Sequence, residues 1–381
     1  MKSVYFDNAA TTPMREEVIT AITEVMRINF GNPSSSHSFG RSSKALVENS
    51  RKMIANSLNV SAGEIIFTSG GTEADNLVLN SVVKDLGIKH IITSKIEHHA
   101  VLHTVEKLRS DFNIDVSYVD IKQNGDIDFE HLEKLLKSDA KTLVSLMHVN
   151  NEIGTILDIK RVADMCKLHN ALFHSDAVQS IGHYKIDLQD VKVDFLAASA
   201  HKFHGPKGVG FAFIRKNSGL KSLIVGGEQE RGLRAGTESI HNIVGIEKAL
   251  QIANSNLESE THYIKGIKQY FIDKIKQAIP EVKFNGCSDS FEKSTYTLVN
   301  VCLPISPKKA AMLLFQLDLK GIACSRGSAC QSGSSKKSHV LSELLNEADL
   351  NKPSIRFSFS TLNTKEEVDY VIGVLKVFNL D

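Results

Sequence analysis

The sequence contains no long apolar run and has almost no net charge. No window approaches the roughly 18 uninterrupted apolar residues of a membrane span. The first residues, MKSVYFDNAATTP, also lack the apolar stretch of a secretion signal. The 45 Lys+Arg against 44 Asp+Glu give a formal charge of +1, which excludes simple attraction to nucleic acid or to an anionic membrane. We therefore expect a cytoplasmic protein that binds neither membrane nor nucleic acid directly.

Cysteine is scarce and scattered. Cys166, Cys287, Cys302, Cys324 and Cys330 form an odd set without a C-x-x-C pair, which argues against a disulfide framework and a structural zinc site. A Walker lysine motif and a G-x-G-x-x-G motif are also missing, so no motif specifies a nucleotide. With 381 residues the chain can bury one large core and a smaller one, which is the size of a typical enzyme.

Short apolar runs alternate with amphipathic stretches between Glu64 and Phe213. The runs predict strands, and helical patterns begin at Thr72 and after His99. This alternation is typical of an α/β fold with a largely parallel central sheet. The expected strands cover residues 64–68, 90–93, 114–119, 142–147, 171–176, 194–199 and 209–214.

A second, smaller part of the chain follows a long periodic stretch that opens at Thr237. We place the boundary near residue 256. Residues 14–255 then form a large domain, and residues 1–13 together with 256–381 form a small α+β domain.

Within this small domain the pattern predicts a strand in 294–304, a helix at 307–319 and a strand at 354–360. Residues 324–339, CSRGSACQSGSSKKSH, are rich in Gly and Ser and favour neither helix nor strand. We expect a mobile surface loop there.

A phosphate-binding turn is predicted at SGGTEADNL, which follows an apolar strand and opens a helix. Gly70 and Gly71 allow the backbone to approach an anion, and Thr72 stands at the helix N-terminus. An ordinary strand-to-helix turn with a threonine cap fits the same residues.

Two polar residues follow apolar strands at the end where open α/β sheets bind ligands. Lys202, in SAHKFHGPKG, has the position of a lysine that loses its proton and forms a Schiff base, although a lysine at a solvent rim fits as well. Asp176, in HSDAVQS, is suited to pair with a protonated pyridine nitrogen, or to cap the helix that follows, or to do both.

A histidine cluster occurs in EHHAVLH. His99 and His103 share a helix face at a spacing that suits a metal, but the sequence supplies no matching third ligand. We interpret His98, just before the helix, as an aromatic cover over a cofactor ring; a solvated histidine cluster is the alternative.

Cys330 lies in the Gly/Ser loop with Arg326 before it and Lys336 and Lys337 after it. Nearby cations lower a thiol pKa and a loop exposes the sulfur, which favours a nucleophile, whereas a merely tolerated exposed cysteine is the alternative. Arg356, in SIRFSFS, is suited to clamp a substrate carboxylate in bidentate geometry or to form a structural ion pair.

Taken together, these segments closely resemble the cysteine desulfurases of the class V aminotransferase superfamily, which are fold-type I pyridoxal-phosphate (PLP) enzymes of iron-sulfur assembly and nitrogen fixation. The resemblance runs nearly end to end. It rests on the ordered strings DNAATTP, GNPSSSH, TSGGTEADN, EHHAVL, HVNNEIGT, HSDAVQS, SAHKFHGPKGVG, GGEQERGLRAGT, RGSACQSGS, SHVL and IRFS.

The resemblance implies a fold and a set of residue roles. The fold would be a large, mostly parallel seven-stranded sheet flanked by helices, with a smaller α+β domain. Lys202 would hold PLP as a Schiff base and act as the base on the substrate α-carbon. The cofactor site would comprise Gly71, Thr72, His98, Asn151, Asp176, Gln179, Ser199, Ala200, His201 and Lys202, and Thr237 of the neighbouring subunit in a homodimer. Asn32, Asn151 and Arg356 would bind the substrate.

The implied activity converts L-cysteine to L-alanine and leaves a persulfide on Cys330, with Cys330, Lys202 and His98 as catalytic residues. Partners would be sulfur acceptors such as an iron-sulfur scaffold or carrier. No intrinsic metal site is expected, although Cys330 would be able to ligate an iron-sulfur cluster transiently with a scaffold. Two alternatives stay open: a selenocysteine lyase, and a non-catalytic assembly scaffold. The loop departs from expectation in its second cysteine, Cys324, and in its two lysines.

Overall fold

A computed structural model describes residues 3–327 and 337–380. Within these residues seven strands form the central sheet, in the order β2-β8-β7-β6-β5-β3-β4. Only β8 runs antiparallel to its neighbours, so the prediction of a mostly parallel seven-stranded sheet is confirmed. The strands are β2 Ile65–Thr68, β3 His90–Thr93, β4 Asp115–Tyr118, β5 Thr142–Ser145, β6 Leu172–Asp176, β7 Phe195–Ser199 and β8 Gly210–Ile214.

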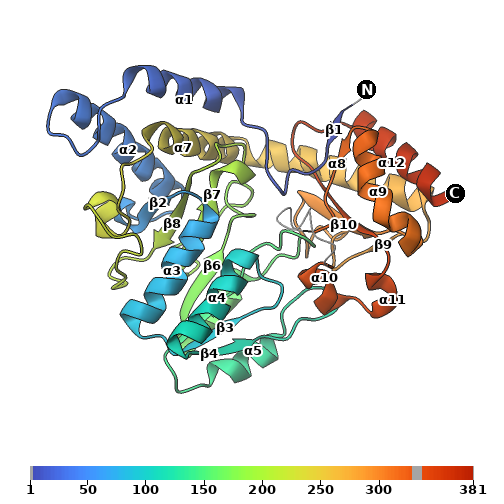
Figure 1. The fold of residues 1–381 in the computed structure, drawn as a ribbon, viewed down its shortest axis with the longest axis horizontal. Helices are drawn as coiled ribbons and strands as arrows, with labels where there is room; N and C mark the ends of the chain where they lie inside the picture. The colour runs from blue at the N-terminus through green and yellow to red at the C-terminus, as the bar shows by residue number, and fades with distance from the viewer. Residues whose placement is uncertain (1–2, 328–336, 381) are drawn as a thin grey trace.

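Helices cover both faces of this sheet (Figure 1). One face packs against α3 and α4, and the other packs against α2, α6 and α7. A parallel strand that is buried on both faces must be apolar throughout, which explains the runs of apolar letters in the sequence. The helices of this part are α1 Glu16–Ile28, α2 Ser38–Ser57, α3 Gly71–Leu86, α4 His99–Phe112, α5 Phe129–Leu136, α6 Ile159–Leu168 and α7 Ile240–Ser255.

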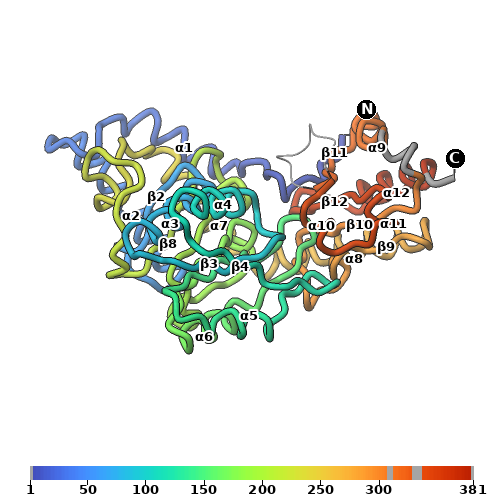
Figure 2. The backbone as a smooth tube through the Cα atoms, turned by 60° about the horizontal axis from the view of Figure 1, so that its bottom comes forward, coloured from blue at the N-terminus to red at the C-terminus, as the bar shows by residue number. Residues whose placement is uncertain are grey.

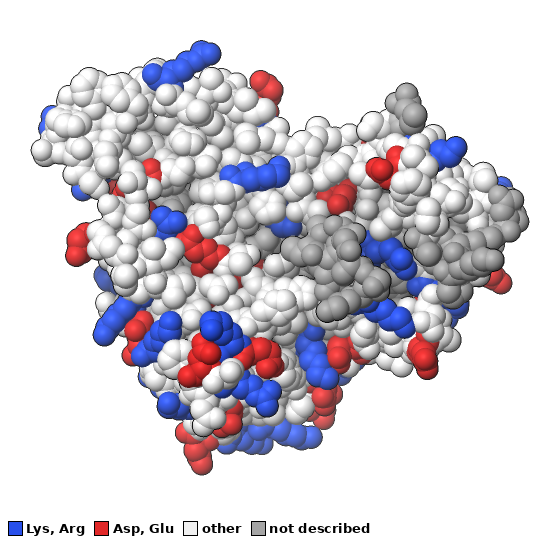
Figure 3. Space-filling view, viewed as in Figure 1, with Lys and Arg blue, Asp and Glu red and all other residues white. Residues whose placement is uncertain are grey.

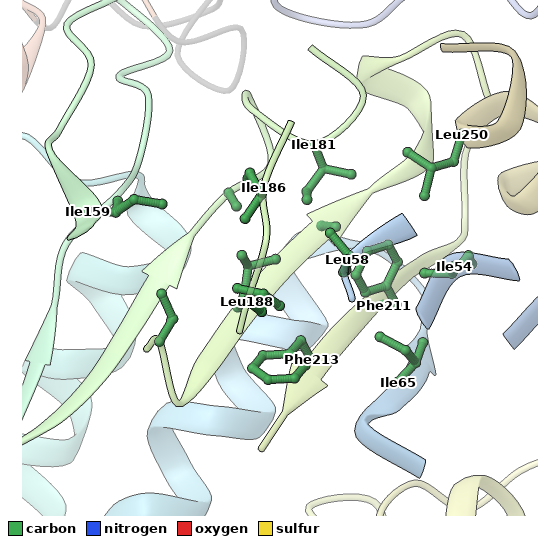
Figure 4. Close-up of a cluster of buried hydrophobic side chains, with 14 of the residues drawn as sticks. Ile54, Leu58, Ile65, Ile159, Ile181, Ile186, Leu188, Phe211, Phe213 and Leu250 are labelled. Atoms are coloured by element: carbon green, nitrogen blue, oxygen red, sulfur yellow. The ribbon is translucent and has the colours of Figure 1, made fainter. Parts of the chain in front are cut away.

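Neighbouring residues of a central strand point to opposite faces of the sheet and so belong to different hydrophobic cores. Phe211 and Phe213 of β8 enter the core on the α2 and α7 side, whereas Ala212 between them enters the core on the α3 and α4 side. Figure 4 shows the first of these cores, where Phe211 lies beside Ile54 of α2 and Leu58. The period of two along a strand thus builds two separate hydrophobic layers from one apolar run.

The C-terminal part of the chain has its own core. The buried cluster of Phe271, Val301, Phe357 and their neighbours also takes in Val4 and Phe6 from the N-terminus, because β1 pairs with β11 in parallel. Figures 1 and 2 both place the first strand beside the C-terminal elements. The elements are β1 Val4–Tyr5, α8 Leu257–Ala278, β9 Lys283–Phe284, β10 Leu298–Cys302, α9 Pro307–Leu319, β11 Ile322–Ala323, α10 His339–Leu344, α11 Glu347–Leu350, β12 Ser354–Ser358 and α12 Lys365–Leu380.

The periodic stretch that opens at Thr237 forms two helices rather than one. α7 starts three residues later, at Ile240, and ends at Ser255, and Asn256 separates it from α8. This break coincides with the boundary predicted near residue 256. The exact domain limits stay a prediction, which the two separate cores support.

Part of the predicted loop 324–339 lies outside the described residues, and Cys330 and Lys336 are in that part. Its last residue, His339, belongs to α10, which the Ser338 hydroxyl caps by accepting a hydrogen bond from the Leu341 amide.

The surface has little charge segregation on the side drawn in Figure 3, where Lys and Arg are interspersed with Asp and Glu. Among the described residues, no helix combines the length and apolar character that crossing a membrane requires.

Candidate active site

The predicted site residues meet at the carboxyl ends of the parallel strands. Asp176 ends β6 and Ser199 ends β7, and the short 3₁₀ helix 200–202 that follows carries Lys202. A cavity of about 200 Å³ opens between them. Ten predicted residues line it: Gly71, Thr72, His98, Asn151, Asp176, Gln179, Ser199, His201, Lys202 and Arg356.

Four other predicted residues have different positions. Ala200 is buried behind the cavity, between Ser199 and His201. Asn32 and Thr237 are exposed and are not among the residues that line the cavity within the described chain. Cys330 lies outside the described residues.

An anion cradle forms where α3 begins. Gly70 is the N-cap and has no side chain to cap the helix, and Gly71 and Thr72 of the first turn line the cavity. The first amides of an α-helix have no acceptor within the helix and carry its positive dipole end. A Cβ on Gly71 would lie 2.4 Å from Val178 Cγ2, so only glycine allows this close approach. The hydroxyls of Thr72 and Ser199 line the same cavity. Amides at a helix N-terminus together with two hydroxyls form a donor set that fits a phosphate group.

His201 completes the cradle as a neutral imidazole. Burial, and then the nearby Lys202 and Lys207 cations, lower the pKa of His201 to about 4. Its Nδ1 lies 3.1 Å from the Thr11 hydroxyl. At neutral pH this residue therefore acts as a hydrogen-bonding group and not as a cation.

Asp176 is a buried carboxylate, only 5% exposed. It accepts a 2.9 Å hydrogen bond from the Val178 amide and so caps the turn that follows β6, whereas the helix that the capping interpretation expected there is not formed in residues 177–183. Burial raises the pKa of Asp176, whereas His98, the Val178 amide and Lys202 oppose that rise. A protonated ring nitrogen in the cavity would supply the counter-charge that a buried carboxylate needs, so the site fits a pyridinium.

The sequence did not point to Asp75, which faces the same cavity from α3. Burial and the charges of Asp176 and Glu97 raise the pKa of Asp75 well above its usual value. Its Oδ1 lies 3.3 Å from Nε2 of His174, which burial keeps neutral with a pKa of about 3. The only available signal was helical spacing, because Asp75 stands one turn after Gly71 on the same face of α3.

His98 is the N-cap of α4, and its orientation is well defined. Its Nδ1 accepts a 3.1 Å hydrogen bond from the Ala100 amide, so the proton of the neutral ring resides on Nε2. Burial lowers the pKa of His98, which favours the neutral form. The rings of His99 and His103 lie 4.7 Å apart between centroids. In the part of the chain that the structure describes, however, no group of three potential ligands could hold a metal ion.

The Lys202 amine lies at one wall of the cavity. It donates hydrogen bonds to the carbonyl oxygens of Ala9 at 2.7 Å and Ala10 at 2.9 Å. Gln179 Nε2 donates to the same Ala9 oxygen at 2.9 Å. The DNAATTP segment thus closes the cavity and holds two of the predicted residues.

Arg356 reaches the cavity from β12 and is almost fully buried. Its Nη1 donates to the Asn151 carbonyl at 2.6 Å, and its Nη2 donates to Asp7 at 2.9 Å. The structural ion pair suggested as an alternative is therefore present, yet the guanidinium also faces the cavity. Its Nε is buried without a hydrogen-bond partner among the described residues.

The described cysteines are poor nucleophiles. Burial raises the pKa of Cys324 to about 12 and raises those of Cys166, Cys287 and Cys302 as well. These thiols stay protonated at neutral pH, so the sequence-based choice of Cys330 as the nucleophile has no competitor among them.

A largely parallel sheet covered on both faces, with a lysine, a carboxylate and an anion cradle at the strand ends, is the architecture of the fold-type I PLP enzymes. The chain belongs to the aminotransferase class-V family, whose model matches residues 4–371. The resemblance found in the sequence is thereby confirmed.

Individual relatives are cysteine desulfurases. Cysteine desulfurase IscS of Dictyoglomus turgidum is 41% identical over 380 residues, which cover 98% of this chain and 94% of that protein. The solved structure of a NifS-like protein superposes with a TM-score of 0.89 at 36% identity and covers 99% of both chains. The structure of SspA in complex with cysteine has a TM-score of 0.80 at 32% identity and covers 95% of this chain and 100% of that one.

Proposed function

We propose that this chain is a PLP-dependent cysteine desulfurase that converts L-cysteine to L-alanine and transfers the sulfur to Cys330 as a persulfide. The observation that carries the proposal is the meeting of Lys202, Asp176 and the anion cradle around one cavity that Arg356 also lines. The relatives named as cysteine desulfurases, and the relative solved with cysteine, support the choice of substrate.

The residues around the cavity are suited to hold PLP. Lys202 would bind its aldehyde carbon, Asp176 its ring nitrogen and Gln179 its phenolic oxygen, with His98 over the ring and Asn151 beside it. The phosphate would lie in the cradle of Gly71, Thr72, Ser199, Ala200 and His201. When bound, PLP takes up the electron pair that the substrate α-carbon keeps after it loses its proton.

Lys202 and His98 would position the transferred proton. The Lys202 amine would hold the cofactor and, once the substrate amine takes its place, would accept the proton from the substrate α-carbon. His98 presents an Nε2 proton, because its Nδ1 is occupied by the Ala100 amide. Burial lowers the pKa of His98 and favours the neutral imidazole, so His98 would present this Nε2 proton to the site as a hydrogen-bond donor.

Arg356 is proposed to bind the substrate carboxylate, with help from Asn32 and Asn151. Asp7 and the Asn151 carbonyl hold the guanidinium in place, so little side-chain entropy remains to be lost on binding. This contact would fix the orientation of the substrate in the cavity.

The sulfur step belongs to Cys330. Its thiolate attacks the substrate sulfur, an S–S bond forms as the carbon–sulfur bond breaks, and the electron pair returns to the carbon skeleton that leaves as alanine. The persulfide then passes to an acceptor such as an iron-sulfur scaffold or carrier.

The assembly that we propose is a homodimer in which Thr237 of each subunit contacts the phosphate in the other. Thr237 is exposed in the single chain, as a residue with an intermolecular role should be. We also propose the division into a large domain (14–255) and a small domain (1–13 with 256–381). A cytoplasmic location is proposed because free thiols persist in a reducing compartment.

Mass spectrometry of the purified protein after brief exposure to L-cysteine tests this function. We expect one added sulfur on the peptide that contains Cys330, and none in the Lys202→Ala variant. An unmodified Cys330 peptide in the wild-type protein would contradict the proposal.

The Cys330→Ala variant separates the alternatives. A sulfur-specific enzyme loses cysteine turnover in this variant and keeps selenocysteine turnover. A non-catalytic scaffold turns over neither substrate and lacks the visible absorption of a PLP–lysine bond.

A further inference from the structure

The segment 226–237, GGEQERGLRAGT, has an unusual backbone. Glu230 and Arg231 have left-handed φ angles of 46° and 60°, which non-glycine residues rarely adopt, and Gly232 and Gly236 are also left-handed. Such a strained residue persists only where its surroundings impose the conformation. Side-chain contacts should therefore hold this segment in place.

One such contact is a buried ion pair at Glu230. Both of its carboxylate oxygens accept from the Arg51 guanidinium, at 2.6 and 2.9 Å, and Oε2 also accepts from the Phe67 amide at 2.7 Å. Phe67 lies in β2, the strand that leads directly into the phosphate cradle. Glu230 thus connects segment 226–237 to Arg51 and to β2, the strand immediately before the phosphate cradle.

A second contact joins the segment to the cradle itself. Arg234 Nε donates to Glu73 Oε1 at 2.9 Å, and Glu73 Oε2 accepts from the Ser69 amide at 2.9 Å. Glu73 therefore bridges Arg234 and the Ser69–Thr72 turn that forms the cradle. Burial opposes the charge of Glu73, but these bonds outweigh it and lower the pKa of the carboxyl below its usual value.

We propose that Glu73 and Arg234 are positioning residues that couple the phosphate cradle of a subunit to its own segment 226–237. A phosphate that immobilises the Ser69–Thr72 turn also fixes the Glu73 carboxylate, and through it Arg234 and the strained backbone before Thr237. The consequence for the dimer rests on the proposed function: a subunit that has bound its cofactor presents an ordered Thr237 to the neighbouring site. Cofactor binding at the two sites is then positively coupled.

Hydrogen exchange followed by mass spectrometry tests this link without using activity. In cofactor-free protein, PLP should slow exchange of the amides in residues 228–236 by up to about fivefold, the size expected from one partly buried charge pair. Pyridoxal is the matched control ligand, because it can react with Lys202 but brings no phosphate to the cradle. It should leave exchange of this segment unchanged.

Two variants break the pair from opposite sides. Glu73→Gln removes the charge but keeps an oxygen for the Ser69 amide, and Arg234→Gln leaves Glu73 in place; both retain the Arg51–Glu230 pair. Each should abolish the slowing by PLP. Asp190→Asn, which removes a carboxylate from the exposed Lys160–Asp190 pair, should preserve it.

The outcomes separate this inference from the proposed function. Slowing that survives in both pair variants, or that pyridoxal also produces, would overturn the link. In Thr237→Ala the slowing should persist, and its loss there would mean that direct contact across the dimer, and not the ion pair, orders the segment.

A failure of the proposed function looks different. If PLP does not bind, as seen by its absorption, the proposed function is wrong. Inorganic phosphate at high concentration, used in place of PLP, then tests the link between the cradle and the segment alone. If Thr237→Ala leaves PLP affinity unchanged, only the role across the dimer falls.

Discussion

The guanidinium of Arg356 donates a hydrogen bond to the carboxylate of Asp7, with 2.9 Å between Nη2 and Oδ1. The same oxygen accepts from the Ser325 hydroxyl at 2.8 Å, at the start of the loop that leads to Cys330. The N-terminal segment, the arginine proposed to bind the substrate and the first residues of the loop that contains Cys330 therefore share one anchor.

Arg356→Lys should raise KM for cysteine by about 10- to 100-fold and reduce kcat much less, because a compact ammonium lacks the planar fork with which a guanidinium can bond Asp7, the Asn151 carbonyl and a substrate carboxylate in different directions. Steady-state kinetics check this. Asp7→Asn keeps an acceptor for Arg356 and should raise KM by less than about tenfold. An unchanged KM in the lysine variant would assign Arg356 a structural role alone.

Two carboxyls line the cavity, but only one should carry charge. Asp176→Asn should weaken PLP binding at least about 100-fold, because a buried pair of charges loses one partner. Asp75→Asn should change it less than about threefold, because burial and the charges of Asp176 and Glu97 raise the pKa of Asp75 and favour its uncharged form. Titration of cofactor-free protein with PLP, followed by absorption, distinguishes the two. Equal effects would refute the assignment.

Gly71→Ala should lower PLP affinity by about tenfold or more, because a Cβ at 2.4 Å from Val178 Cγ2 forces the cradle to shift. Gly266→Ala is the matched control: this residue lies inside α8 and an added Cβ meets nothing within 4 Å. That variant should bind PLP normally and gain about 0.5–1 kcal/mol of stability. Normal PLP binding by Gly71→Ala would count against the cradle.

The two cysteines at the ends of CSRGSAC, Cys324 and Cys330, should behave differently. Cys330→Ser should abolish persulfide formation, whereas Cys324→Ser should retain it, because burial raises the pKa of the Cys324 thiol to about 12 and keeps it protonated. Alkylation followed by peptide mass spectrometry after exposure to cysteine reads out both. A persulfide on Cys324 in either protein would show that the assignment is incorrect.

Lys268 predicts a pH dependence of stability. Burial lowers the pKa of its amine to about 7, and the amine donates to the Thr295 carbonyl at 2.7 Å. In the unfolded chain the pKa is about 10.4, so between these values the unfolded state binds more protons and the free energy of unfolding rises with pH.

Urea unfolding between pH 7 and 10 measures this effect. Lys268→Met should remove a slope of up to about 1.4 kcal/mol per pH unit, the contribution of one titrating proton. The comparison is the difference between variant and wild type at each pH, since other groups titrate in both. Parallel pH profiles for the two proteins would mean that Lys268 keeps an ordinary pKa when folded.

The sequence by itself determined the alternation of strands and helices. The apolar run of residues 90–93 is β3 to the residue, and the helix expected at 307–319 is α9 with the same limits. Such signals are local, because strand burial and helix periodicity repeat over a few residues. The position of Lys202 and Asp176 at strand ends followed in the same way, since parallel strands bring their carboxyl ends to one edge.

Only the tertiary structure decided which charged residues pair. Arg356 meets Asp7 across 349 positions and Arg51 meets Glu230 across 179, and no local pattern links either pair. The raised pKa of Asp75 depends on burial and on the charges of Asp176 and Glu97, which come from other parts of the chain. A side chain's charge state depends on burial and neighbours in three dimensions. For this reason the sequence identified which residue types form the site, whereas the tertiary structure determined their ion pairs and pKa shifts.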